Sequence, residues 1–145
     1  MATLERAIQL AAIYHANQFD KMGKPYILHP LRVMSNLGLD VIEADRIVAV
    51  LHDALEDTEL TESDLNEEGF TQEIITAIKL LTKTKGYDEE EYFRNILNNP
   101  IARRVKIKDL EDNMNYARLK NKLNLEDKDL KRIQNYVKRH HQLSK

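Results

Sequence analysis

The feature that most constrains the fold is an apolar run that ends in a group of ionisable residues. Residues 41–51 carry hydrophobic side chains on nearly every side of a helix, so this helix is expected to be central and buried. His52, Asp53, Glu56 and Asp57 follow it directly. Burying a carboxylate is costly unless the group is paired or holds a metal. This part of the chain therefore predicts a metal site with supporting acids around it.

Helical periodicity continues through almost the whole chain, and no convincing alternating strand pattern appears. The four glycines and three prolines fall where the periodicity breaks. Together these patterns predict an all-α protein, a compact multi-helix bundle. Thr61 with Asp64 is typical of a helix N-terminus, and Pro30 and Pro100 are expected in first helical turns. The helices are expected near residues 3–18, 30–37, 40–56, 61–68, 71–84, 88–98, 101–119 and 126–142.

Length and composition limit the classes of function. The 145 residues suit one domain, 1–145, with one core. The chain has no cysteine, so a metal would be held by nitrogen and oxygen. A net charge of −2 gives no general electrostatic footprint for nucleic acid. Without a signal segment or a membrane-length apolar run, a soluble cytoplasmic protein is expected, with neither nucleic acid nor membrane as a partner.

Basic residues are dense in two short segments, and the chain lacks a glycine-rich phosphate loop. The two segments form either a small anion-binding rim or the solvated faces of helices, and the sequence leaves both open; they contain Lys79, Lys83 and Lys85, and Arg103, Arg104, Lys106 and Lys108. Four scattered glycines cannot build a phosphate-binding loop. Phosphate would therefore have to be bound by a metal and by basic side chains.

Three segments supply candidate metal ligands. His29 precedes Pro30, which predicts that His29 is the cap residue of the next helix. His52 and Asp53 are adjacent on the buried helix, about 100° apart, so both side chains can converge on one ion. Asp109 lies on a helix that apolar residues anchor in the core, although an ordinary exposed acidic face is the alternative. Two imidazoles and two carboxylates suit Mn²⁺, Fe²⁺ or Mg²⁺.

These segments resemble a known family, the HD-domain superfamily. Within it, the chain is most similar to the hydrolase domain of RelA/SpoT-type (p)ppGpp enzymes and to the stand-alone small alarmone hydrolases. The resemblance covers most of the chain, from about residue 4 to 119, with motifs in the family's order. The matching motifs are His15-Ala16-Asn17-Gln18, Gly23-Lys24-Pro25-Tyr26-Ile27-Leu28-His29-Pro30, Leu51 to Thr58, Thr82-Lys83, and Lys108-Asp109 with Asn113-Met114.

The resemblance implies an HD-domain bundle with a single metal site and a metal-dependent phosphohydrolase activity. Glu56 and Asp57 match the acidic pair that polarises the attacking water, and Glu56 is four residues from His52, on the same helix face. Mn²⁺ is the implied cofactor, with Fe²⁺ or Mg²⁺ as alternatives. The implied metal ligands are His29, His52, Asp53 and Asp109.

The resemblance also implies substrate contacts, and here the chain departs from the family. Lys21 and Lys83 match basic positions near the substrate phosphates, and Asn113 matches a polar contact. Family members that cleave guanosine tetraphosphate usually have an arginine stacked on guanine where this chain has Asp20, and a carboxylate repels phosphate. Lys24 is expected to restore part of the lost positive charge. The metal site thus matches while the base pocket differs.

Two further side chains and one segment have alternative roles. Tyr26 is expected to fill the core rather than contact the ligand, and His15 is either structural or a support of the pocket. The usual Asp-Arg-Leu-His-Asn segment is replaced by residues 109–113, Asp-Leu-Glu-Asp-Asn. His140 and His141 end the last helix, where cations suit the helix dipole, and are assigned no chemistry.

Three functions follow from these residues. The first is removal of a 3′-pyrophosphate from an alarmone such as ppGpp, the chemistry of the stringent response. The second is the same chemistry on another nucleotide, such as NADPH or ppApp, which Asp20 favours. The third is a non-catalytic nucleotide sensor, although the chain keeps both the ligands and the acid pair that such a protein would be expected to lose. The oligomeric state does not follow from the sequence.

Overall fold

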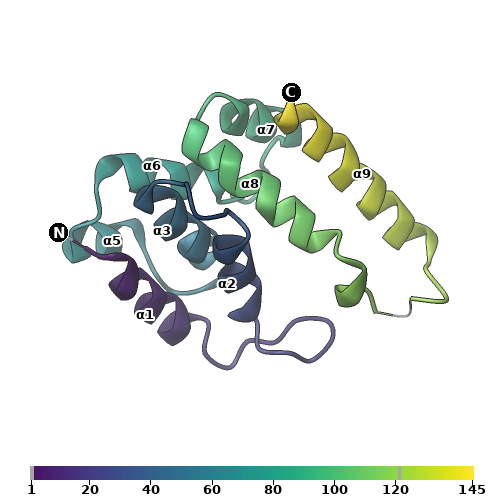
Figure 1. Ribbon diagram of the computed structural model, residues 1–145, viewed down its shortest axis with the longest axis horizontal. Coiled ribbons are helices and arrows are strands. Elements are labelled where there is room, and N and C mark those ends of the chain that lie inside the picture. The colour runs from purple at the N-terminus through teal and green to yellow at the C-terminus, as the bar shows by residue number, and fades with distance from the viewer. Residues whose placement is uncertain (1, 121) are drawn as a thin grey trace.

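The computed structural model describes residues 2–120 and 122–145, which fold into helices joined by loops (Figure 1). Within these residues there is no strand, only an isolated bridge between Phe19 and Pro25, so the all-α prediction is confirmed. Met1 and Asn121 of the predicted domain lie outside the described residues. The helices are α1 (Leu4–Tyr14), α2 (Leu28–Ser35), α3 (Glu43–Leu51), α4 (Ala54–Asp57), α5 (Glu62–Glu68), α6 (Gln72–Leu81), α7 (Glu89–Leu97), α8 (Pro100–Asn113), the 3₁₀ turn η1 (Tyr116–Arg118) and α9 (Asp127–Ser144).

Helix α3 is the centre of the core, as its apolar sequence predicts. It contacts α1, α2, α6 and α8, while α8 continues the bundle by packing against α7 and α9 (Figure 1). Residues 47–51 of α3 are all buried. The buried Asp45 carboxylate accepts hydrogen bonds from Arg104 Nε at 2.6 Å and Nη2 at 3.0 Å, which joins α3 to α8. The metal site predicted after residue 51 therefore lies directly after the buried part of α3.

Local capping signals set several helix starts. Thr61 and Asp64 form the predicted N-terminal arrangement, with reciprocal side-chain to backbone hydrogen bonds, and Pro100 is in the first turn of α8. The prediction for His29 as a cap residue is wrong, because α2 already begins at Leu28 and places His29 inside its first turn. Amide groups of the first turn have no helical acceptor, so Pro30 breaks no helical bond there.

The expected helix 40–56 is interrupted at its functional end. Helix α3 ends at Leu51, and α4 starts only at Ala54. The His52 ring donates to Ala49 O at 2.6 Å, the carbonyl that a continuing helix would offer to residue 53. His52 and Asp53 are thus in a turn rather than adjacent on one helix. The expected helix 101–119 likewise ends at Asn113 and is followed by η1.

The basic segment on α8 does not form an anion-binding rim. Arg103 Nε donates to Leu143 O at 2.6 Å, Arg104 pairs with Asp45, and Lys106 is buried.

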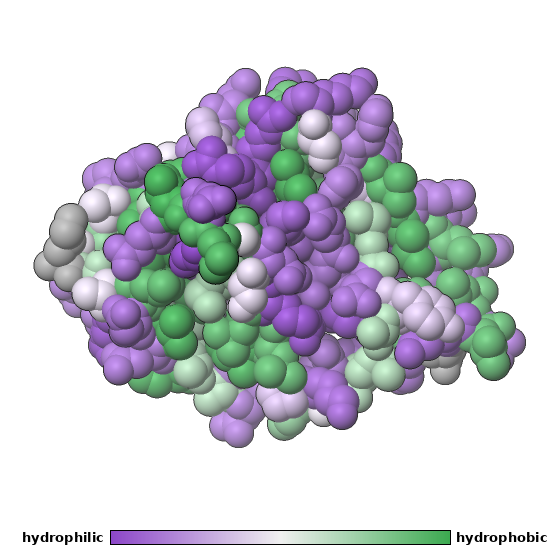
Figure 2. Space-filling view, viewed as in Figure 1, coloured by the Kyte–Doolittle hydropathy of each residue, from purple (hydrophilic) through white to green (hydrophobic). Residues whose placement is uncertain are grey.

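Figure 2 shows hydrophilic residues across the middle of one face, with apolar groups on either side. Over the described part of the chain, none of the helices combines the length and apolar character needed to cross a membrane.

Candidate metal centre

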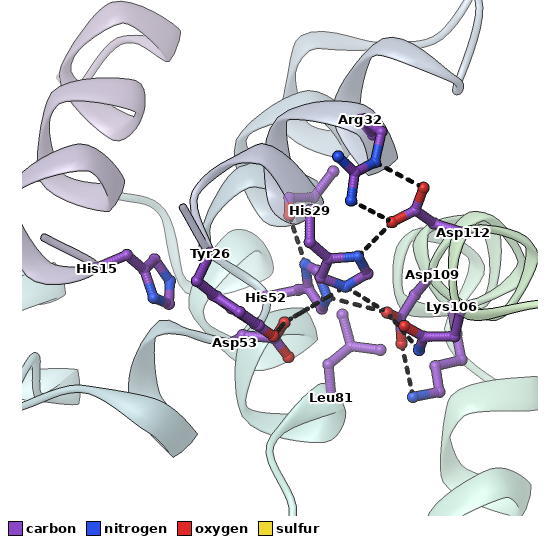
Figure 3. A network of polar contacts seen from close by, with 12 residues as sticks. His15, Tyr26, His29, Arg32, His52, Asp53, Leu81, Lys106, Asp109 and Asp112 are labelled. Atoms are coloured by element: carbon purple, nitrogen blue, oxygen red, sulfur yellow. Dashed lines mark hydrogen bonds and ion pairs between the residues drawn. The ribbon is translucent and has the colours of Figure 1, made fainter. Parts of the chain in front are cut away.

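The four predicted ligands meet where α2, the end of α3 and α8 come together (Figure 3). His29 comes from the first turn of α2, and His52 and Asp53 come from the turn after α3. Asp109 extends from α8 toward both imidazoles. His29, His52 and Asp109 are buried, while Asp53 is partly open. Three elements distant in sequence thus build one enclosed cluster.

The distances between donor atoms suit a single metal ion. His29, His52 and Asp53 each offer a ligand atom within 4.8 Å of the others, the one such group among the described residues. His52 Nε2 lies 3.0 Å from Asp53 Oδ2, and His29 Nε2 lies 3.6 Å from the same oxygen. Asp109 Oδ1 lies 2.9 Å from His29 Nε2 and 3.3 Å from His52 Nε2. Bonds of about 2.1 Å that meet at right angles would separate neighbouring donors by about 3 Å, so these separations suit neighbouring ligands of one divalent cation. Asp109 is close to both imidazoles but is not a member of the mutually close group of three.

Hydrogen bonds on the far side of each ring turn Nε2 toward the cluster. His52 Nδ1 donates to Ala49 O at 2.6 Å. His29 Nδ1 donates to Asp112 Oδ2, also at 2.6 Å. Such bonds fix the orientation of an imidazole and raise its basicity as a metal ligand. Both rings are therefore held with the correct nitrogen toward the other donors.

Lys106 holds the other oxygen of the Asp109 carboxylate. Its Nζ lies 2.8 Å from Asp109 Oδ2 and 5.4 Å and 5.8 Å from the ring centroids of Tyr92 and Phe93. Burial acts to raise the pKa of Asp109, but the charges of Lys106 and His52 outweigh it and hold that pKa well below its usual range. Asp109 is therefore ionised, with Oδ1 directed at the imidazoles.

The metal-free cluster balances its own charges. Burial acts to lower the pKa of His52, but Asp53 and Asp109 outweigh it and hold the pKa well above the usual range. Burial is outweighed at His29 as well, where Asp109 and Asp112 raise the pKa. Burial acts to raise the pKa of Asp53, but His52 lowers it to about 2. The carboxylates thus favour protonated imidazoles in the absence of metal, and metal binding would displace those protons.

Tyr26 belongs to the site rather than to the core, contrary to expectation. Its hydroxyl donates to Asp53 Oδ2 at 2.6 Å, and its ring lies between His15 and His29, with centroid distances of 5.2 Å and 5.7 Å (Figure 3). Burial and the charge of Asp53 raise the pKa of Tyr26, so it remains a donor. His15 is buried behind Tyr26, and its Nδ1 lies 2.8 Å from Gln18 Oε1.

The acid pair lies on α4, beside the cluster and at the surface. Glu56 accepts a hydrogen bond from the backbone N–H of Lys83 at 2.7 Å, which fixes its carboxylate. Gln18 donates to Asp57 O at 2.9 Å. Partial burial, together with the charges of Asp53 and Glu56, raises the pKa of Asp57 to about 6. Asp57 can therefore hold or release a proton near neutral pH.

A pocket of about 670 Å³ opens beside the cluster, between the loop before α2, η1 and the first half of α9. Of the predicted substrate contacts, Lys21 and Asn113 line it. Lys24 and Lys83 are exposed, and neither is among the lining residues. Asn113 donates to Asp109 Oδ1 at 3.2 Å, so the pocket reaches the cluster. The lining residues are Phe19, Asp20, Lys21, Tyr26, Asn113, Arg118, Leu119, Lys120, Leu125, Glu126, Lys128, Asp129, Arg132 and Tyr136.

Sequence reasoning does not single out three residues of the site. Asp112 supports His29, Lys106 binds Asp109, and Arg118 lines the pocket while donating to Asp112 Oδ2 at 2.9 Å. The spacing of Asp112 from Asp109 places both on one helix face, which is a usable signal. Lys106 resembles a surface lysine, and nothing local distinguishes Arg118.

Several known proteins are similar in sequence to this chain. No protein-family model matches the chain. It is 34% identical over 122 residues to a guanosine-3′,5′-bis(diphosphate) 3′-pyrophosphohydrolase of Aquifex aeolicus, a match to 77% of this chain and 17% of the relative. It is 36% identical over 81 residues to the protein of that name in Borreliella burgdorferi, covering 54% of this chain and 12% of the relative. A GTP pyrophosphokinase of Myxococcus xanthus is 42% identical over 65 residues, covering 44% and 9%.

A solved structure shares the fold over nearly the whole chain. It belongs to a metazoan ortholog of SpoT that is described as hydrolysing ppGpp. The TM-score is 0.77 at 22% sequence identity, and the match covers 99% of this chain and 85% of the other. The chain thus spans less than a fifth of the curated relatives it matches but most of one solved structure.

Proposed function

We propose that the chain is an HD-type hydrolase domain, similar to that of RelA/SpoT enzymes, and that it removes 3′-pyrophosphate from an alarmone such as ppGpp in a metal-dependent reaction. The observation that carries the proposal is the convergence of His29, His52, Asp53 and Asp109. The cluster lies beside a pocket whose lining residues Tyr26 and Asn113 donate hydrogen bonds to Asp53 and Asp109. The relatives named as 3′-pyrophosphohydrolases support this substrate. We also propose that residues 1–145 form one hydrolase domain.

The proposed ligands of the metal are His29, His52, Asp53 and Asp109. Nitrogen and oxygen donors suit Mn²⁺, with Fe²⁺ or Mg²⁺ as alternatives. When bound, the ion supplies positive charge that neutralises phosphate and makes water more acidic. Tyr26 donates to Asp53 and so keeps the most open of these carboxylates in place.

Asp57 is the proposed general base. The oxygen of water forms a bond to the phosphorus that carries the 3′ oxygen, while the bond from this phosphorus to the 3′ oxygen breaks. Asp57 takes a proton from the water, and the 3′ oxygen takes up a proton to become the hydroxyl of the nucleoside diphosphate. The products are the nucleoside diphosphate and pyrophosphate. A pKa of about 6 lets the Asp57 carboxylate accept the proton of the attacking water at neutral pH. Glu56, fixed by the Lys83 amide, adds negative charge that raises the pKa of Asp57.

Basic and polar side chains of the pocket are proposed to hold the substrate phosphates. Lys21 and Arg118 line the pocket and supply positive charge, and Asn113 supplies an amide beside Asp109. Arg118 Nε has no hydrogen-bond partner within the described part of the chain. Lys24 and Lys83 are proposed as outer contacts, because both are exposed outside the lining of the pocket.

The test is product analysis with defined nucleotides. Protein loaded with Mn²⁺ is incubated with ppGpp, ppApp and NADPH, and the products are separated by anion exchange. We expect GDP and pyrophosphate from ppGpp, and neither product from His52→Ala or Asp109→Ala, which should also lose the metal. Inertness on every nucleotide, with metal shown to be bound, would instead favour a nucleotide sensor. Metal and activity retained in His52→Ala would exclude the proposed coordination.

A second candidate is the same chemistry on a nucleotide other than ppGpp. Asp20 is bound to its own loop, since its Oδ1 accepts hydrogen bonds from the amides of Met22 at 2.9 Å and Lys24 at 3.0 Å. Phe19, which lines the pocket, is 65% exposed and offers a flat surface that suits any base. Asp20→Arg should raise activity on guanosine substrates if the missing arginine matters. Asp20→Asn, which keeps an acceptor oxygen for the loop, is its control.

A further inference from the structure

The two imidazoles of the cluster are oriented by different kinds of partner. His52 donates to a backbone carbonyl, Ala49 O, three residues before it. His29 donates to the Asp112 carboxylate, 83 residues away in sequence. The orientation of His52 is therefore set by the end of α3 directly before it, whereas that of His29 depends on a side chain of α8.

Asp112 is itself fixed by two guanidinium groups. Arg32 Nε donates to Oδ1 at 2.9 Å, and Arg118 Nη1 donates to Oδ2 at 2.9 Å. The carboxylate is buried, and its oxygens are taken by the two arginines and His29. It is therefore held in place and has no oxygen directed at the other donors of the cluster.

Without this carboxylate, the His29 ring would face a cation. Arg118 Nη1 lies 3.3 Å from His29 Nδ1, and both atoms carry hydrogen. Asp112 Oδ2 accepts from both, which makes the close approach favourable. Removing the negative charge would leave two donors facing each other, and the ring would be expected to turn away from its present orientation.

We propose that Asp112 is a positioning residue of the metal centre, which holds the His29 ring with Nε2 toward the metal while Arg118 links the carboxylate to the pocket wall. This proposal depends on the proposed function, in which His29 is a ligand of the metal. Partners that hold a ligating histidine from behind typically change metal affinity by about 10–100-fold when they are removed.

Metal binding tests the proposal without substrate. Mn²⁺ is titrated into purified protein, and the free ion is measured by its electron paramagnetic resonance signal. Asp112→Asn should bind Mn²⁺ about 10–100-fold more weakly. Glu111→Gln is the matched control, because it removes the neighbouring charge on α8, which pairs with Lys108 and His140 rather than with the cluster. The control should bind as tightly as the unchanged protein.

If Asp112→Asn does not fold, a double variant that keeps the net charge unchanged is used in its place. Arg32→Gln with Asp112→Asn removes one cation and one anion together, and Arg32→Gln alone is its reference. In the Mg²⁺-loaded protein, the imidazole N–H proton of His29 should also shift upfield in Asp112→Asn but not in Glu111→Gln, because a neutral acceptor replaces the carboxylate. Equal Mn²⁺ affinity in folded protein with and without the carboxylate would overturn the proposal, whatever the protein does to nucleotides.

Discussion

Replacing Lys106 by methionine should destabilise the metal-free protein far more than the metal-loaded one. The Lys106 side chain is 9% exposed, and its Nζ lies 2.8 Å from Asp109 Oδ2. Methionine keeps an unbranched apolar side chain at this position but removes the charge, and with it the cation–π contacts to Tyr92 and Phe93. Asp109 would then keep only its contacts with the imidazoles and Asn113 on the other oxygen.

The magnitude follows from the burial of the pair. Removing one partner of a buried ion pair costs about 3–5 kcal/mol, and the remaining partners of Asp109 favour the lower end, about 3 kcal/mol. For a domain near this size, 1 kcal/mol shifts Tm by about 2–4 °C, so the metal-free variant should melt about 6–12 °C lower. A bound divalent ion neutralises Asp109 in place of the ammonium, so the loss should fall by about half. The difference, about 1.4 kcal/mol, corresponds to Mn²⁺ binding about tenfold tighter in the variant.

Thermal unfolding followed by circular dichroism, with EDTA or with saturating Mn²⁺, gives both values. Lys108→Met is the control, because Lys108 pairs with Glu111 near the surface and should contribute at most about 1 kcal/mol. An equal fall in Tm with and without Mn²⁺, or a variant as stable as the control, would refute the account of Lys106 and Asp109.

Three further outcomes follow from the site. Asp57→Asn should lower kcat by about 10²–10⁴-fold at unchanged Mn²⁺ affinity, measured by pyrophosphate release, and a kcat near that of the unchanged protein would remove its role as base. Arg118→Gln should raise KM by about tenfold or more, the effect of losing one charge-assisted hydrogen bond to phosphate; an unchanged KM would exclude that contact. Folding raises the pKa of His52, so the protonated ring stabilises the metal-free protein fully below about pH 6.5. This stabilisation is lost as the pH rises through the raised pKa. Mn²⁺ affinity should increase over the same pH interval, because the metal binds the deprotonated ring. Melting curves with EDTA and Mn²⁺ titrations at several pH values check both trends, and parallel trends would contradict this assignment.

Local sequence pattern is sufficient for the fold class and for the kind of site. Helical spacing, glycines and prolines act over a few residues, so the all-α class and capping at Thr61 could be predicted from local pattern. The charges after residue 51 require compensation because the run before them is buried, and this requirement predicts a metal site there. The assignment of His52 and Asp53 as its ligands comes from the family resemblance.

The packing of distant segments adds the groups around the predicted ligands that sequence reasoning does not single out, such as Asp112 and Lys106. The contacts of His29 with Asp109 and Asp112 join residues 80 and 83 positions apart, and no local pattern predicts such a pairing. Lys106 shows the same limit, because a lysine on a helix is usually solvated and only the packing of α7 and α8 buries this one against Asp109. The periodicity of a segment indicates which of its faces packs against the core. Which charges form pairs depends on which distant segments the fold brings side by side.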